Sequence, residues 1–320
     1  MTMNDDLTFC LTRPTDVPAP DGLQAWCEQW RQLAAEDHNP VGLALRGGFA
    51  ADRVGWAFAA GYQSALRQLI QVNGGTVDDH ELLAMCATEA SGNRPRDIET
   101  RIADDGPGGV TVTGRKTWTT LGSACTGLLV VGRVDGGGET DRPALKIAKV
   151  DTHGQGVSLV EKPPLEFVPE VPHVAAVFDG AKAEALLPGD GYSDFVKPFR
   201  TVEDTFIALA VQAWLVREGR ARGWPRSFLE SLIASQAGLA AVAAQPAGAP
   251  ATHIALAGAL ARTNDLYQQA DALWADERDA AAERWRRDRP LFCSCLLFRS
   301  CLLFRSRPLF HMSRRSFRIA

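Results

Sequence analysis

The hydrophobic residues follow a helical period at both ends of the chain and a strand-like pattern in its middle. In residues 22–36 and 51–71, apolar side chains recur at spacings of three and four, which places them on one face of a helix. Asn73-Gly74-Gly75 supplies a break after the second segment. The pattern predicts an N-terminal helical region over residues 1–80, built on these two helices.

From about residue 80 to residue 180 the apolar residues come in short runs, separated by clusters of Gly, Pro and Asp. Regular short strands with this punctuation indicate an antiparallel barrel or sandwich. No Gly-x-Gly-x-x-Gly turn leads from a strand into a helix, so a Rossmann fold has little support. We therefore predict a central β-domain over residues 81–195. Its predicted strands are Leu82–Thr88, Ile98–Ile102, Val110–Thr113, Leu128–Val134, Ala144–Val150, Val157–Val160 and Val174–Phe178.

Helical periodicity returns over residues 196–290. It predicts three antiparallel helices, at 201–222, about 227–244 and about 252–287, which suggest a C-terminal bundle. The remaining residues, 291–320, contain the hexapeptide Ser-Cys-Leu-Leu-Phe-Arg twice in tandem. No helix or strand period explains this repeat. We predict an anomalous, disordered tail, and a duplication or reading-frame shift is the most economical hypothesis for it.

Composition and charge narrow the class of protein. Hydrophobic residues make up 46% of the chain and charged residues 22%, as in ordinary soluble globular proteins. No apolar run approaches the roughly 20 residues of a membrane span, and no secretory signal is visible. We therefore expect a cytoplasmic protein without membrane contact. After Asp288 the chain has arginines but no acidic residues, so the net charge of residues 1–288 is more negative than that of the whole chain. This negative charge argues against nucleic-acid binding by residues 1–288. The seven cysteines form no paired CxxC motif, so neither a metal site nor a disulfide framework is expected.

Two segments of the β-region carry a recognisable pattern. Residues 86–93 read CATEASGN, and residues 112–120 read VTGRKTWTT. Together they resemble the signatures of the acyl-CoA dehydrogenase family, in which a TEPxAGSD turn is followed by xGxKxWITN. Three further pieces fit the same family in order and spacing, at Leu128–Arg133, Val177–Gly180 and Leu186–Tyr192. The resemblance runs from about residue 51 to residue 290.

The resemblance implies a multidomain fold: N-terminal helices, a central antiparallel β-barrel or sandwich, and a C-terminal antiparallel helical bundle. Both helical regions are short for the family, so we expect a truncated member. The turn after Thr88 and Glu89 also departs from the family, because it lacks the proline and the Gly-Ser-Asp.

The family binds FAD, and the resemblance assigns residues to that cofactor. Trp118 would supply a flat apolar wall for the flavin ring, while Thr88 and Thr120 would offer hydroxyls to it. The backbone from Cys86 to Thr88 would approach the pyrimidine edge. The alternative interpretation is structural: Trp118 is a core aromatic on a strand, and the two threonines are β-formers on a half-buried face.

The implied chemistry is α,β-dehydrogenation of an acyl thioester. A carboxylate removes the α-proton while the β-hydride passes to the flavin. In some members the base lies on the first helix after the β-domain, and Glu203 falls at that place. The alternative interpretation is an acidic residue in the first turn of a helix, where the macrodipole favours it.

The resemblance also implies partners. We expect an acyl-CoA or similar thioester substrate, an electron-accepting redox partner and a homo-oligomer. Two other functions stay open. The chain could be a degenerate, non-catalytic homologue that serves as scaffold or partner subunit, or a flavin-dependent monooxygenase of the same fold, which needs no glutamate base.

Overall fold

A computed structural model of the chain describes residues 2–106, 109–134 and 143–292. Its N-terminal region is helical, with α1 (Met3–Thr12), α2 (Gly22–Glu36), α3 (Pro40–Ala50) and α4 (Val54–Val72). The sequence predicted α2 and α4 but neither α1 nor α3. Helix α3 was missed because it is almost wholly buried: Pro40 and residues 42–49 are buried, so no polar face marks the helical period. Its start is nevertheless encoded, because Asn39 accepts a hydrogen bond from Val41 N and Pro40 follows this cap.

The C-terminal region is a second set of helices: α5 (Lys197–Arg222), α6 (Arg226–Ala243), α7 (Pro250–Leu273) and α8 (Ala280–Asp288), with a short 3₁₀ turn at Arg289–Phe292. The prediction of one long helix over 252–287 is wrong. The helix ends at Leu273, and a new one begins after Asp279, whose carboxylate accepts from the backbone N–H groups of Ala281 and Ala282.

Stacked indoles fill the core of this bundle. The Trp214 ring lies 5.8 Å from both Trp274 and Trp285, centroid to centroid. Leu291 and Phe292 are buried as well, so the packed bundle extends two residues past the predicted boundary at 290. The rest of the predicted tail, with its tandem hexapeptide, lies outside the described residues.

The central β-domain forms one sheet from strands β1 (Leu83–Cys86), β2 (Arg101–Asp104), β3 (Val110–Thr120), β4 (Gly127–Val134), β5 (Leu145–Asp151), β6 (Val157–Glu161) and β7 (His173–Leu186). The ladder runs β4–β2–β3–β7–β5 and returns to β4, so the strands close into a barrel. The predicted barrel is thus confirmed. It is not purely antiparallel, because β1 and β2 both pair with β4 in parallel.

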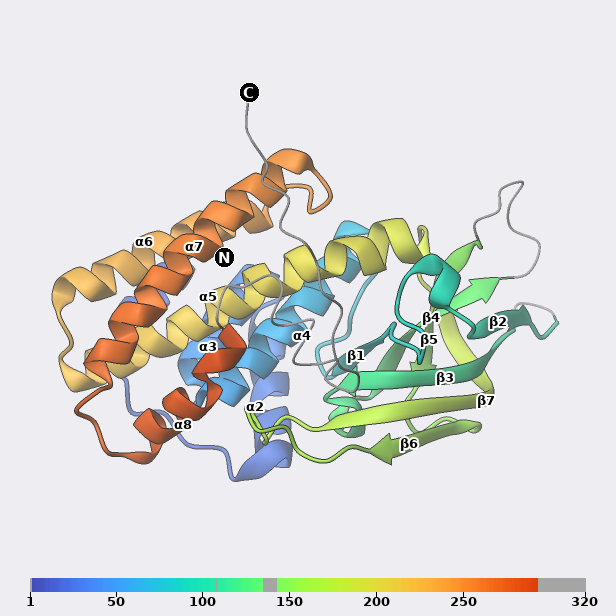
Figure 1. The fold of residues 1–320 in the computed structure, drawn as a ribbon, viewed down its shortest axis with the longest axis horizontal. Coiled ribbons are helices and arrows are strands. Elements are labelled where there is room, and N and C mark those ends of the chain that lie inside the picture. Colours follow the sequence, from blue (N-terminus) through green and yellow to red (C-terminus); the bar gives the residue numbers. More distant parts are fainter. Residues whose placement is uncertain (1, 107–108, 135–142, 293–320) are drawn as a thin grey trace, which may run out of the picture.

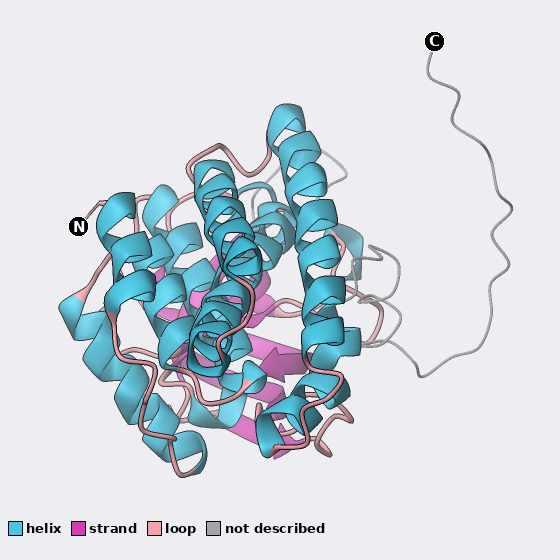
Figure 2. Ribbon diagram, turned by 90° about the vertical axis from the view of Figure 1, so that its left-hand side faces the viewer, coloured by secondary structure: helices cyan, strands magenta, loops and turns pink. Residues whose placement is uncertain are grey.

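The helices gather on one side of the barrel (Figure 1), and a view through them shows the strands behind (Figure 2). Helix α5 begins beside the sheet and runs the length of the helical part, next to α4. Gly61 of α4 and Gly48 of α3 let these helices pack closely on α5. A Cβ at Gly61 would lie 2.6 Å from the Ile207 Cα, and one at Gly48 would lie 2.1 Å from the Ala210 carbonyl oxygen. Within the described residues, no helix is both long and apolar enough to cross a membrane.

Candidate functional site

A pocket lies where the barrel meets the start of α5. It holds about 1450 Å³ of empty space, including the part open to solvent. Three segments contribute most of its wall: the chain from β1 into the following turn, the end of β3, and the first turns of α5. Its lining residues are Tyr62, Met85, Ala87, Thr88, Glu89, Ala90, Asn93, Thr117, Trp118, Thr120, Lys162, Val196, Phe199, Arg200 and Glu203.

A β-bulge in β3 presents Trp118 to this pocket. Lys116 pairs with Ala176 of β7, and Thr119 pairs with Val174, so two residues of β3 oppose one residue of β7. Such a bulge re-aims the side chains of the strand that carries it. Trp118 and Thr120 are both half-buried at the pocket wall, whereas Thr119 between them is fully buried.

The bulge is bonded to the segment that carries Thr88. The Thr117 backbone N–H donates to the Thr88 carbonyl oxygen at 2.8 Å. The Thr117 hydroxyl donates to the same oxygen at 3.3 Å. Thr88 and Trp118 therefore stand on two segments that cannot move independently.

The Glu89 carboxylate holds this wall in place through four hydrogen bonds. Its Oε1 accepts from Lys116 Nζ at 2.6 Å, from Thr100 N at 3.1 Å and from Thr100 Oγ1 at 2.7 Å, and its Oε2 accepts from Glu99 N at 2.7 Å. Burial alone would raise the pKa of Glu89, yet the Lys116 ammonium and the other donors hold that pKa below its ordinary value. Lys116 is fully buried. One carboxylate thus ties together the segment after β1, the segment before β2, and β3.

The helical wall of the pocket carries Phe199, Arg200 and Glu203 on one face of α5. Arg200 Nε donates to the Asp204 carboxylate at 2.7 Å, so its charge is compensated on the helix itself. Tyr62 of α4 closes the gap to the barrel: its hydroxyl accepts from the Met85 backbone N–H at 3.0 Å. Burial raises the pKa of Tyr62 well above its ordinary value, so the phenol stays protonated.

Two further side chains touch Trp118. The His173 ring centroid lies 4.8 Å from the indole, and Lys162 Nζ lies 5.1 Å from the indole centroid, over the ring. Burial, and then the nearby Lys162 ammonium, lowers the pKa of His173 to about 4. At neutral pH the imidazole is therefore uncharged, and Lys162 is the charged neighbour of the indole.

The structure brings four of the five sequence-predicted site residues together: Thr88, Trp118, Thr120 and Glu203 all line the pocket. Cys86 does not. It is fully buried, it pairs with Val130 of β4, and its Sγ lies 3.4 Å from Thr119 Oγ1. Because its side chain points into the barrel, Cys86 supports the wall from inside. Trp118 lies on a strand and is half-buried at the pocket, so part of its surface is open to a ligand.

Sequence reasoning missed Tyr62, Lys162 and Arg200. Tyr62 belongs to the apolar face of the helix predicted over residues 51–71, and the helical pattern does not reveal that it also lines the pocket. The signal for Arg200 was its position three residues before Glu203, on the same helical face. For Lys162 the sequence offers no signal, because its place depends on which strand pairs with β7.

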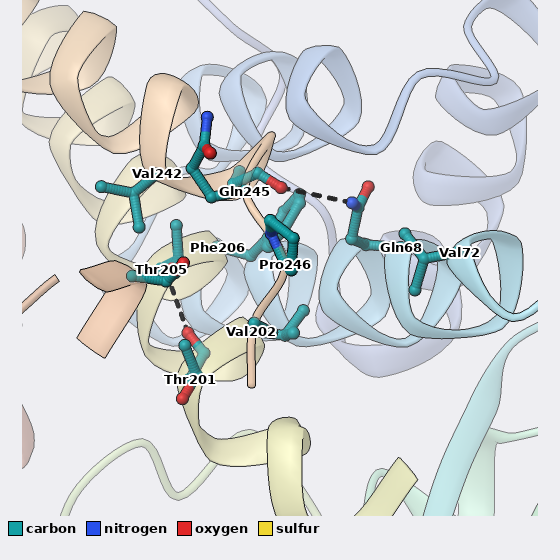
Figure 3. Close-up of a pocket in the computed structure, with 12 residues that line it drawn as sticks. Gln68, Val72, Thr201, Val202, Thr205, Phe206, Val242, Gln245 and Pro246 are labelled. Atoms are coloured by element: carbon teal, nitrogen blue, oxygen red, sulfur yellow. Dashed lines mark hydrogen bonds between the residues drawn. The ribbon is translucent and has the colours of Figure 1, made fainter. Parts of the chain in front are cut away.

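A second pocket lies on another face of α5, between α4 and the end of α6 (Figure 3). Gln68 Nε2 donates to the Ala243 carbonyl across it at 3.4 Å, and Thr205 Oγ1 donates to the Thr201 carbonyl at 2.8 Å. Val202 and Phe206 make its floor apolar. None of its lining residues is ionisable, so this pocket offers no acid, base or charged group. The pocket at Trp118 is the candidate active site.

The residues at Trp118 suit a flat heteroaromatic ring with a polar edge. An indole surface offers stacking area, and the hydroxyls of Thr88 and Thr120 offer donors beside it. Such a donor set fits a flavin. A metal ion has no comparable place, since among the described residues no cluster of His, Cys, Asp and Glu could hold one.

No protein-family model matches the sequence, and a comparison with curated proteins finds no match. Solved structures do match. Butyryl-CoA dehydrogenase from Megasphaera elsdenii is 14% identical, with a TM-score of 0.60, and the match covers 91% of this chain and 94% of that one. A glutaryl-CoA dehydrogenase from Mycobacterium smegmatis in complex with FADH2 is 14% identical, with a TM-score of 0.53 and coverage of 92% and 91%. The prolyl acyl carrier protein oxidase AnaB is 14% identical, with a TM-score of 0.61 and coverage of 90% and 92%. Identities this low establish the fold alone. The protein has the α–β–α fold of the acyl-CoA dehydrogenases, as its strand and turn motifs predicted.

Proposed function

We propose that this protein is a flavin-dependent oxidoreductase that acts on the CH–CH group of an acyl thioester, with FAD as its cofactor. One observation carries the proposal: an indole and two hydroxyl side chains on the barrel share a pocket with a carboxylate on α5, opposite them. The solved relatives support it, because one of them is a glutaryl-CoA dehydrogenase in complex with FADH2. The redox partner and the homo-oligomer expected from the sequence remain part of this proposal.

FAD bound here would accept the hydride from the substrate. The chain's own residues supply orientation. Trp118 offers a surface for the ring, Thr88 and Thr120 offer hydroxyls to its polar edge, and the Glu89 network keeps these groups in fixed register. Pre-organised groups of this kind avoid the cost of arranging them at the moment of reaction.

Glu203 is our candidate for the base. It stands on a rigid helix across the pocket from the barrel residues, where a substrate between the two walls would present its α-proton. Tyr62 and Phe199, whose ring centroids are 6.1 Å apart, also line the pocket and would limit the access of water to a bound substrate. A carboxylate is a stronger base where water is excluded.

The first test is the spectrum of the purified protein, with and without added FAD. A yellow protein that binds FAD supports the proposal. A colourless protein that binds no added FAD would contradict it and favour the non-catalytic homologue.

The second test addresses the base. Glu203→Gln should still bind FAD but should abolish bleaching of the flavin by acyl-CoA substrates under anaerobic conditions. Glu230→Gln, an exposed position on α6 outside the pocket, is the matched control and should bleach as the wild type does. Unchanged bleaching in Glu203→Gln would remove Glu203 as the base. Rapid NADH oxidation with oxygen and free flavin would instead point to the monooxygenase.

A further inference from the structure

Lys162 is a cation that lines the pocket. Lys116 is paired with Glu89, and Arg200 with Asp204. No carboxylate of the described residues lies within ion-pair distance of Lys162 Nζ; the ammonium lies over the Trp118 indole instead. A half-buried charge that lines a ligand pocket without a protein partner is available to a ligand.

The backbone holds Lys162 at this place. Its N–H donates to the His173 carbonyl oxygen at 2.9 Å, which extends the β6–β7 ladder by one residue. Residues directly opposite in an antiparallel pair point to the same side of the sheet. His173 is also opposite Thr120 of β3. Lys162, His173 and Thr120 therefore share one side of the sheet, the side on which Trp118 lies.

The geometry points to Lys162 as a positioning residue for negative charge on the flavin ring. This inference rests on the proposed function and deepens it. A ring that stacks on the exposed indole face must displace the ammonium from above Trp118. A cation–π contact at a half-exposed site is weak, so the displacement costs little. The fixed backbone keeps the displaced ammonium at the edge of the ring, beside Thr120.

At that edge the ammonium has an electrostatic role. A hydride that passes from the substrate adds two electrons and one proton to the ring, and so one net negative charge. A nearby cation stabilises the charged form more than the oxidised form. His173 does not duplicate this effect, because the imidazole is neutral at pH 7. Lys162 would therefore bias the pocket towards the reduced cofactor.

The size of the bias follows from Coulomb's law. A unit charge about 6 Å away, at an effective dielectric constant of about 40 for a site that is half open to water, shifts an equilibrium by about tenfold. For a two-electron couple, tenfold corresponds to about 30 mV. We expect Lys162→Met, which keeps the length of the side chain and removes its charge, to lower the midpoint potential of the bound flavin by about this amount.

The experiment measures the midpoint potential by dye equilibration, and the dissociation constant of oxidised FAD by fluorescence. Lys162→Met should lower the potential while oxidised FAD binds within about threefold of wild type. Lys162→Arg keeps the positive charge, so its flavin should have the midpoint potential of the wild type. Lys182→Met, an exposed lysine on β7, is the matched control and should change neither quantity.

An unchanged potential in Lys162→Met would overturn the inference. So would an equal loss of affinity for oxidised and reduced FAD, because Lys162 would then act as a steric wall or as a contact to the phosphates. A wild-type protein that binds no flavin would overturn the proposed function itself, so the two failures are distinguishable.

Discussion

The buried pair of Glu89 and Lys116 offers the most direct test of how the pocket wall is held. Lys116→Met removes the ammonium but leaves the carboxylate with three donors, from Glu99 N, Thr100 N and Thr100 Oγ1. Glu89→Gln is the harsher change. It leaves a fully buried ammonium whose other contact is the Ala87 carbonyl oxygen at 3.5 Å.

Removal of one partner from a buried ion pair costs about 3–5 kcal/mol of unfolding free energy. We place Lys116→Met near the lower limit, at about 3 kcal/mol, and Glu89→Gln near the upper limit, at about 5 kcal/mol. The double variant leaves neither charge uncompensated. Its cost should therefore fall short of the sum of the two single costs by about 2 kcal/mol or more.

Urea unfolding followed by circular dichroism, on the wild type and all three variants, measures these costs. The exposed pair of Arg226 and Glu230, whose side chains are 91% and 61% exposed, is the matched control, and its loss should cost less than about 1 kcal/mol. Additive single costs, or a Lys116→Met cost no larger than that of the control, would refute the reasoning.

The same series has a pH signature. Because the folded-state pKa of Glu89 lies below its ordinary value, the carboxylate contributes stability that is present above the ordinary pKa. This stability is lost as the pH falls through the lowered pKa. The wild type should therefore lose more stability than Glu89→Gln between about pH 5 and pH 2. Parallel acid profiles of the two proteins would speak against an ionised, stabilising Glu89.

Three further predictions concern other parts of the fold. The folded-state pKa of His173 is about 4, so below about pH 6.5 the unfolded state binds a proton that the folded state does not, and the free energy of unfolding should fall by about 3 kcal/mol towards pH 4. His173→Phe should flatten this pH dependence in urea unfolding, and an unaltered pH dependence would disprove the assignment. Gly61→Val should lower the free energy of unfolding by about 3 kcal/mol because it forces α4 away from α5. Gly258→Ala, on the exposed face of α7, should be neutral or stabilising by up to about 1 kcal/mol. Similar melting temperatures for the two variants would contradict this. A chain that ends at Asp288 should melt lower than one that ends at Phe292, because the 3₁₀ turn after α8 is packed into the bundle; equal melting temperatures would count against that packing.

Periodicity predicted the elements that have one polar and one apolar face. Helices α2, α4, α5 and α6 appear within a few residues of their predicted bounds, and so do the predicted strands other than β3 and β7. Periodicity did not predict the bounds of elements that are set by packing against other elements. Strands β3 and β7 are longer than predicted because they pair with each other along most of their length, from Thr120 with His173 to Thr111 with Lys182, which short apolar runs cannot reveal. The break between α7 and α8 depends on an Asp279 cap that is hidden in an alanine-rich run.

The site residues were predictable only where a motif named them. Trp118, Thr120 and Thr88 are close in the fold because a bulge on β3 bonds to the end of β1, and sequence spacing alone does not reveal this contact. For Cys86 the motif predicts a contact through the backbone, and this stays a prediction. Its side chain is buried, because neighbouring positions of a strand face opposite sides of the sheet.

The departures from the family's turn bear on how much the site can vary. The turn that follows Glu89 lacks the family's proline and Gly-Ser-Asp, yet the chain still folds back there: Glu89 and Gly92 exchange two backbone hydrogen bonds, at 2.8 and 3.2 Å. The acidic residue of that motif and the lysine of the next are both retained, and they form the buried pair. Because Glu89 accepts from four donors on two other segments, it fixes where the turn begins. The pocket wall can therefore keep its geometry although Ala90 and Asn93, which also line the pocket, depart from the family's motif.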